Sequence, residues 1–194
     1  MKRNLYGIMI IAVMFLVSGC ATTAPRHMMF QDAPSVNISS VKPENGKAAL
    51  VVVRTTKLGG AIEFDTYLEK KMIGVTQWKS FFVKTDVTPG VYYVFSKAEN
   101  IETVKINFEP DRVYYIHQSP RMGAWRARVS IALEALDQIM SEFDSDTRYV
   151  VYDPKDIGED LSDEDYAQAV ADYEREVKEG LHKEYEGYRG VSGK

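Results

Sequence analysis

Three arginines and a tryptophan lie close together in the segment SPRMGAWRARVS, which makes it the best candidate ligand site in the sequence. These residues are Arg121, Trp125, Arg126 and Arg128. Guanidinium groups donate paired hydrogen bonds to phosphate and carboxylate groups. We therefore expect an anionic ligand here, such as a phosphate, a carboxylate or a sugar acid. The alternative is a solvent-exposed loop whose arginines pair with nearby acidic residues or with the acidic C-terminal segment.

His117, in the segment YYIHQS, is a second candidate because it could face a cleft beside Gln118 and Ser119. The alternative is a strand histidine whose hydrogen bonds are all satisfied. The other histidines, His27 and His182, lie far away along the chain, so we predict no metal site. A serine-nucleophile motif such as G-x-S-x-G is absent from the sequence. We therefore predict no catalytic residue and no cofactor.

The composition limits the classes of protein to which the chain can belong. Its 194 residues, 45% of them hydrophobic and 27% charged, suffice for one globular domain with a substantial core. The single cysteine excludes an intrachain disulfide, a cysteine-rich zinc site and an iron–sulfur cluster. A formal net charge of −4 argues against a nucleic-acid-binding protein, which normally has a strongly basic face. We expect no nucleic-acid partner.

The N-terminal residues have the pattern of an export signal. Lys2 and Arg3 precede an apolar run over residues 8–17. A helix needs roughly 20 apolar residues to span a bilayer, and this run has about half of that number. We therefore predict a signal peptide over residues 1–19.

The end of this segment, LVSGC, resembles the lipobox of bacterial lipoproteins, with an aliphatic residue, two small residues and a cysteine. The resemblance implies cleavage between Gly19 and Cys20 and acylation of Cys20, so that membrane lipid becomes its partner. The residue after the cysteine is Ala21 and not aspartate, which is the retention signal in the sorting rule of enteric bacteria. By resemblance to that rule, Ala21 implies the outer membrane, with the protein facing the periplasm. The alternative is an ordinary signal peptide or an uncleaved anchor with an incidental cysteine.

Residues 20–46 contain three prolines among small and polar residues and show no sustained period of a helix or a strand. We predict that they form a lipidated flexible tether. Random-coil scaling over such a length gives a reach of about 25–30 Å, which would lift a domain off the headgroups. In the alternative, Met28, Met29 and Phe30 pack on the domain or dip into the bilayer surface.

Between residues 47 and 152, short runs of β-branched and aromatic residues alternate with turn sequences. The runs are AALVVVRTT, AIEFDTYLEK, MIGVTQ, SFFVKTDV, VYYVFSK, ETVKINFE and VYYIHQS. Seven or more short strands joined by turns are typical of an antiparallel β-sandwich, so we predict a mainly β domain of that kind. We also expect a strand over residues 127–135 that continues into a short helix ending near residue 143, and an edge strand over residues 148–152.

The order of ALVVVRTTKLGGA, YLEKKMIG, FFVKTDVTPGVYYV and VKINFEPDRVYYIHQSPRMG resembles a domain-of-unknown-function family that is common in short bacterial lipoproteins. The segment YLEKKMIG and the turn sequence PG-x-Y are also similar to the PEGA-type repeat of bacterial envelope proteins. The resemblance covers roughly residues 47–140 and implies an Ig-like or PEGA-like sandwich in the cell envelope. It implies no activity, ligand or catalytic residue.

Residues 153–194 carry 13 acidic and 6 basic residues, whereas residues 20–152 carry 15 and 16. Ser162 followed by Asp165 is typical of a helix start. The apolar positions then step by three or four residues. They are Tyr166, Val170, Tyr173, Val177, Leu181 and Tyr185. We predict an acidic, mainly helical extension, interrupted at Gly180, that packs this stripe on the β domain. The alternative is a helix that binds an envelope protein partner or a second copy.

Together these patterns predict a lipid-anchored protein of the cell envelope with a non-catalytic binding or structural role. The alternative function is a periplasmic hydrolase, or an accessory subunit of an envelope enzyme or transport complex.

Overall fold

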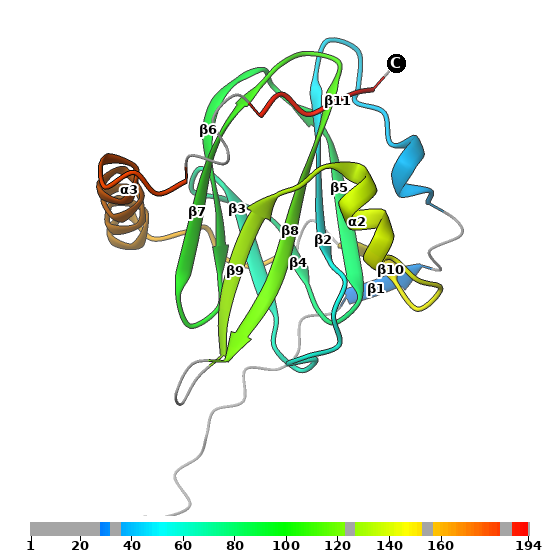
Figure 1. The fold of residues 1–194 in the computed structure, drawn as a ribbon, viewed down its shortest axis with the longest axis horizontal. Helices are drawn as coiled ribbons and strands as arrows, with labels where there is room; N and C mark the ends of the chain where they lie inside the picture. The colour runs from blue at the N-terminus through cyan, green and yellow to red at the C-terminus, as the bar shows by residue number, and fades with distance from the viewer. Residues whose placement is uncertain (1–27, 32–35, 123–126, 153–156, 183–187, 194) are drawn as a thin grey trace, which may run out of the picture.

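The computed structural model describes residues 28–31, 36–122, 127–152, 157–182 and 188–193, which form two facing β-sheets with helices outside them (Figure 1). The larger sheet has the order β1 (Met28–Gln31), β10 (Arg148–Tyr152), β5 (Ser80–Val87), β2 (Ala48–Arg54), β8 (Arg112–Met122) and β11 (Val191–Ser192), and β9 (Ala127–Leu133) also pairs with β8. The smaller sheet has the order β4 (Lys71–Thr76), β3 (Phe64–Leu68), β6 (Gly90–Lys97) and β7 (Ile101–Phe108). The helices are η3 (Ile38–Ser40), α2 (Leu136–Glu142) and α3 (Asp163–Lys178). The prediction of a mainly β, sandwich-like domain with a C-terminal helix is confirmed.

The larger sheet is mixed, so the antiparallel prediction is wrong for part of it. Strand β2 runs parallel to β8, with Ala49 opposite Val113 and Val53 opposite His117, and β10 runs parallel to β5. A parallel pair needs a long crossover connection. Strands β3 to β7 supply it, because the chain leaves β2, builds the smaller sheet and β5, and returns at β8. The smaller sheet is antiparallel throughout.

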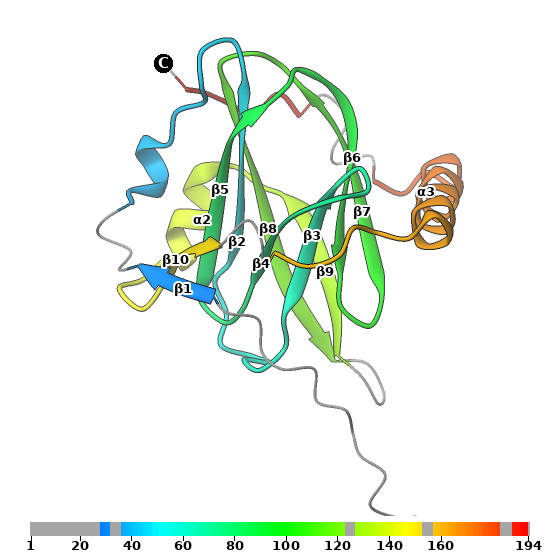
Figure 2. The same cartoon turned by 180° about the vertical axis from the view of Figure 1, so that it is seen from behind.

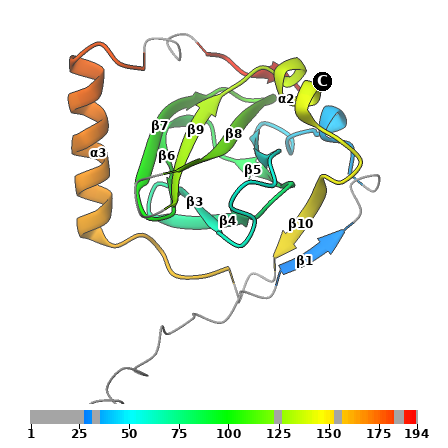
Figure 3. The same cartoon turned by 60° about the horizontal axis from the view of Figure 1, so that its bottom comes forward.

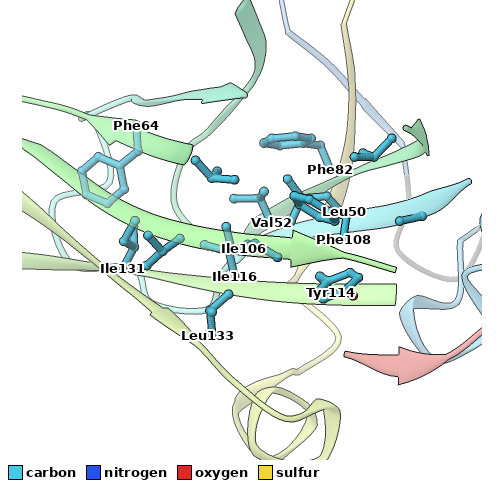
Figure 4. Packing of buried hydrophobic residues seen from close by; sticks show 14 of the residues in the cluster. Leu50, Val52, Phe64, Phe82, Ile106, Phe108, Tyr114, Ile116, Ile131 and Leu133 are labelled. Atoms are coloured by element: carbon cyan, nitrogen blue, oxygen red, sulfur yellow. The ribbon is translucent and has the colours of Figure 1, made fainter. Parts of the chain in front are cut away.

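The main core lies between the two sheets (Figure 4). Alternate residues of β2 point into it, among them Leu50 and Val52, while Val51 and Val53 point to the outer face of the larger sheet. All seven residues of β2 are buried. A strand that is covered on both faces reads as a continuous apolar run, which explains the sequence AALVVV.

Helices cover the outer faces of both sheets (Figure 3). Ile38 of η3 and Ile139 of α2 pack on the outer face of the larger sheet. Helix α3 covers the smaller sheet, where Ala169 and its neighbours pack against Tyr67 and Phe95. Among the described residues, the buried apolar side chains therefore form three clusters, one between the sheets and one under each helical cover.

Helix α3 packs on its own domain, as the first interpretation of the C-terminal stripe predicts. The Ser162 side chain accepts a hydrogen bond from the Asp165 backbone N–H, and the helix ends at Lys178, before Gly180 with a φ of 85°. Tyr166, Val170 and Tyr173 of the stripe contact the smaller sheet. Val177 and Leu181 are exposed, and Tyr185 lies outside the described residues.

Part of the predicted tether is structured. Strand β1 pairs antiparallel with β10, with Met28 opposite Tyr152, and Ile38 is buried under the larger sheet. This agrees with the alternative in which residues 28–30 join the domain. The weak local pattern of β1 could not show this pairing, because its partner lies more than a hundred residues later in the chain.

Several loops gather at one end of the sandwich, which we call the basal end (the lower end in Figures 1 and 2). It contains the β2–β3 loop after Arg54, the β4–β5 turn before Ser80, and the ends of β8 and β9 at Met122 and Ala127. Strand β1 lies toward this end, because its neighbour β10 pairs with the first residues of β5.

Candidate functional site

The predicted lipidation and cleavage residues, Cys20 and Gly19, lie outside the described residues. Met28 is the first described residue of the chain, and its strand is tied to β10. Among the helices that the structure describes, none is long and apolar enough to cross a membrane.

The β8–β9 hairpin brings two of the predicted ligand arginines side by side. Arg121 lies directly opposite Arg128, and the next pair along the same face is Ser119 opposite Ser130. Both arginines are exposed, and neither forms an ion pair with a described carboxylate. Like charges directly opposite each other on a sheet destabilise it. An anion bound between the two guanidinium groups would relieve that repulsion.

The other two predicted ligand residues of this hairpin, Trp125 and Arg126, lie outside the described residues. The carboxylate whose titration Arg121 affects is Glu102 on β7, which accepts a hydrogen bond from Asn100. Burial raises the pKa of Glu102, the charge of Glu176 raises it further, and the charge of Arg121 opposes both. The charge of Arg121 therefore already acts on one carboxylate of the domain, although the two groups form no ion pair.

His117 does not belong to the arginine site. It lies four residues before Arg121 on the same strand, a separation of about 13 Å at the rise of a β-strand. The residue is 6% exposed and its ring lies beneath α2. Nδ1 is 3.1 Å from Glu134 Oε2, and Nε2 is 2.9 Å from the Thr55 hydroxyl oxygen. The structure thus agrees with the alternative of a satisfied strand histidine.

The contacts of His117 have the outline of a nucleophile, a base and an orienting carboxylate, in the order Thr55, His117 and Glu134. The direction of the hydroxyl proton differs, however. Thr55 donates its hydrogen bond to Glu142 Oε2 of α2 at 2.7 Å, and Thr55 is only 5% exposed. A hydroxyl that donates to a carboxylate and lies under a helix is not poised to attack a substrate. The cluster instead ties α2 to β2 and β8.

Gln118, the next residue on β8, points the opposite way and centres a polar network between the sheets. Its side-chain oxygen accepts a hydrogen bond from Thr76, and its nitrogen donates to Thr66 at 3.0 Å and to Ser96 at 2.6 Å. All four residues are fully buried. Sequence reasoning missed this network, because its members come from four strands whose register only the fold reveals.

Arg54 fixes the β2–β3 loop at the basal end. It is fully buried, and its guanidinium donates to the backbone oxygens of Leu58, Gly59 and Ile62 at 2.6 to 2.8 Å. The same group lies 4.2 Å from the centre of the Phe64 ring. Burial lowers the pKa of Arg54 to about 10, which still leaves it charged at neutral pH.

A pocket of about 440 Å³ opens beside β10, between the edges of β4 and β5. Most of its lining is apolar, including Phe82 and Val150, and the lysines at its rim, Lys71 and Lys84, are already paired with Asp160 and Asp86. This pocket could not be predicted from the sequence, because β10 and β4 are far apart along the chain. Within the described residues, no group of three or more His, Cys, Asp or Glu could hold a metal ion.

No protein-family model and no solved structure matches this chain. The chain is 29% identical, over 117 residues, to an uncharacterized protein of Haemophilus influenzae. The aligned part covers 60% of this chain and 67% of that protein. This similarity assigns no activity, ligand or partner.

Proposed function

We propose that this protein is a lipid-anchored component of the bacterial cell envelope that acts by binding and not by catalysis. The observation that carries the proposal is the motif LVSGC, in which the only cysteine of the chain occupies the lipidated position of a lipobox. Strand β1 supports it, because this strand, which pairs with β10, begins eight residues after Cys20. Ala21 favours the outer membrane, with the domain facing the periplasm.

The binding function rests on the paired arginines of the β8–β9 hairpin. Arg121 and Arg128 present two exposed guanidinium groups on one face, beside the hydroxyls of Ser119 and Ser130. Such an arrangement suits a ligand with a phosphate or carboxylate group. A protein partner would meet the part of the C-terminal stripe that its own sheet leaves exposed, at Val177 and Leu181.

The second candidate function is that of a hydrolase or of an accessory subunit. The order of Thr55, His117 and Glu134 favours it. We place it second because the Thr55 hydroxyl is 5% exposed and donates to Glu142. Attack by this oxygen requires α2 to move and the hydroxyl to turn toward His117.

Labelling with a fatty-acid analogue in growing bacteria tests the anchor. We expect the protein to incorporate the label and Cys20→Ser to incorporate none, because the thioether needs the sulfur of this one cysteine. Ser18→Ala, which keeps a small residue in the motif, is the matched control and should be labelled normally. Incorporation that persists in the Cys20→Ser protein, or that is missing from the parent protein, would contradict the proposal.

A further inference from the structure

We propose that the basal end docks on an anionic bilayer surface, with Met122 and Leu58 entering the headgroup region and Arg121 and Arg128 contacting lipid phosphates. The proposal rests on the anchoring through Cys20 proposed above. It goes beyond anchoring, because it assigns the domain a fixed orientation on the membrane and gives the paired arginines their ligand.

Two large apolar side chains are exposed at the basal end. Met122 is 81% exposed, the highest value among the large hydrophobic residues that the structure describes, and Leu58 is 52% exposed. The loops that carry them are neighbours, because a Cβ on Gly59 would lie 3.8 Å from the Pro120 side chain. Exposed apolar side chains beside basic ones are typical of proteins that bind a membrane interface.

The basic residues at this end differ in whether they are already neutralised. Lys57 pairs with Asp146 and Lys79 with Asp144. Arg121, next to Met122, and Arg128, opposite Arg121, form no ion pair with a described carboxylate, although the charge of Arg121 acts on Glu102. Both exposed guanidinium groups can therefore contact an external anion. Juxtamembrane basic residues gain binding free energy at an anionic lipid surface, and the gain falls off within a Debye length.

The backbone that presents these side chains is well fixed. Arg54 holds the carbonyl of Leu58 at 2.6 Å, and the β8–β9 pairing continues to Met122 opposite Ala127. A preformed surface loses little conformational entropy on docking. The backbone at Leu58 and Met122 therefore does not need to become ordered when the domain docks on the membrane.

The length of the tether places this end near the lipid. Cys20 and Met28 are eight residues apart, a span of at most about 29 Å when fully extended. Strand β1 also lies toward the basal end (Figure 1). The acidic residues 153–194, with a balance of 6 basic against 13 acidic residues, favour an orientation that keeps this segment away from an anionic surface.

An environment-sensitive dye tests the orientation of the acylated protein in vesicles. With Cys20 acylated, the chain has no other thiol, so Met122→Cys places a single dye at the basal end. Val91→Cys is the matched control, since Val91 is 59% exposed and lies at the opposite end, at the start of β6. In vesicles of phosphatidylethanolamine and phosphatidylglycerol we expect a blue shift and a severalfold rise in emission at position 122 only.

Two further measurements complete the experiment. The difference in dye emission between positions 122 and 91 should become smaller in vesicles of pure phosphatidylcholine and in high salt. It should also become smaller when the chain carries Arg121→Gln and Arg128→Gln. Flotation with the vesicles is measured first. A chain that does not float contradicts the anchoring and with it the docking. A chain that floats but gives equal emission at positions 122 and 91 contradicts the docking alone and leaves the anchor intact.

Discussion

Two adjacent residues, His117 and Gln118, show how the pleat of β8 separates two polar clusters. His117 faces α2 and contacts Thr55 and Glu134, whereas Gln118 faces the other sheet. The histidine is a candidate from its residue type alone, because imidazole suggests chemistry. The buried network of the glutamine could not be predicted from the sequence, because it depends on the packing of one sheet on the other.

The Gln118 network makes a prediction about stability. Gln118→Ala leaves the hydroxyls of Thr66, Thr76 and Ser96 without this buried partner. We expect the free energy of unfolding to fall by about 2–4 kcal/mol, because buried polar groups without partners cost about 1–3 kcal/mol each. Urea denaturation measures it. Ser130→Ala, on the outer face of the same hairpin, should change stability by less than about 0.5 kcal/mol. Equal stability of the two variants would contradict the structural role of the network.

Helix α3 combines an apolar stripe with a row of acidic side chains that meet lysines of the smaller sheet and its turns. Asp163 contacts Lys70, Asp165 contacts Lys97, and Glu174 contacts both Lys105 and Tyr93. The stripe and the start of the helix could be predicted from spacing alone. The face of the domain that it covers could not, because both sheets have an apolar outer face that a helix can cover.

These pairs predict how α3 responds to acid. Hydrogen bonds from the lysines lower the pKa of Asp163, Asp165 and Glu174. A carboxyl group whose pKa is lower in the folded state adds stability above its unfolded pKa, about 4, and loses it as the pH falls through the folded value. We therefore expect α3 amides to exchange faster relative to the sheets at pH 3 than at pH 6, after correction for intrinsic rates.

A variant with Asp163→Asn, Asp165→Asn and Glu174→Gln is the control for this experiment. Its α3 should show a smaller pH dependence between pH 6 and pH 3 than the original protein, because the substituted side-chain amides do not titrate there, while Asp172, whose pKa Gln168 and Arg175 lower, is present in both. If the original and the control lose protection to the same extent in acid, the ion pairs do not hold the helix.

At the scale of the whole molecule, both sheets depend on covers that come from outside the central strands. Leu161 and helix α3 cover the outer face of the smaller sheet, and β11 pairs with β8. The strand boundaries of the sandwich could be predicted closely from alternation and turn residues. The parallel pairing could not be predicted, because the residue pattern of a strand does not indicate the direction of the neighbouring strand. The pairing of β1 with β10 could not be predicted either, because both segments have weak local patterns.

Truncation after residue 160 tests the role of this cover. Leu161 and Tyr173 are buried in the interface, and burying a large apolar side chain contributes about 1.5–3 kcal/mol. We expect the truncated chain to lose at least about 3 kcal/mol of unfolding free energy in urea and to bind an apolar dye. An unchanged midpoint would show that the sandwich is independent of α3, as expected for a helix that serves only a partner.

The parallel pairing of β2 with β8 also determines when the chain can fold. Strand β2 leaves the ribosome early, yet its neighbours β5 and β8 come much later, and the partner of β1 comes later still. Pairing between segments that are distant along the chain is slow, because closing the long loop between them costs conformational entropy before the new contacts can form and offset it. The export proposed for this chain would require it to remain unfolded until it has crossed the inner membrane. This topology gives the chain that delay, since the central sheet cannot close until most of the sequence is available.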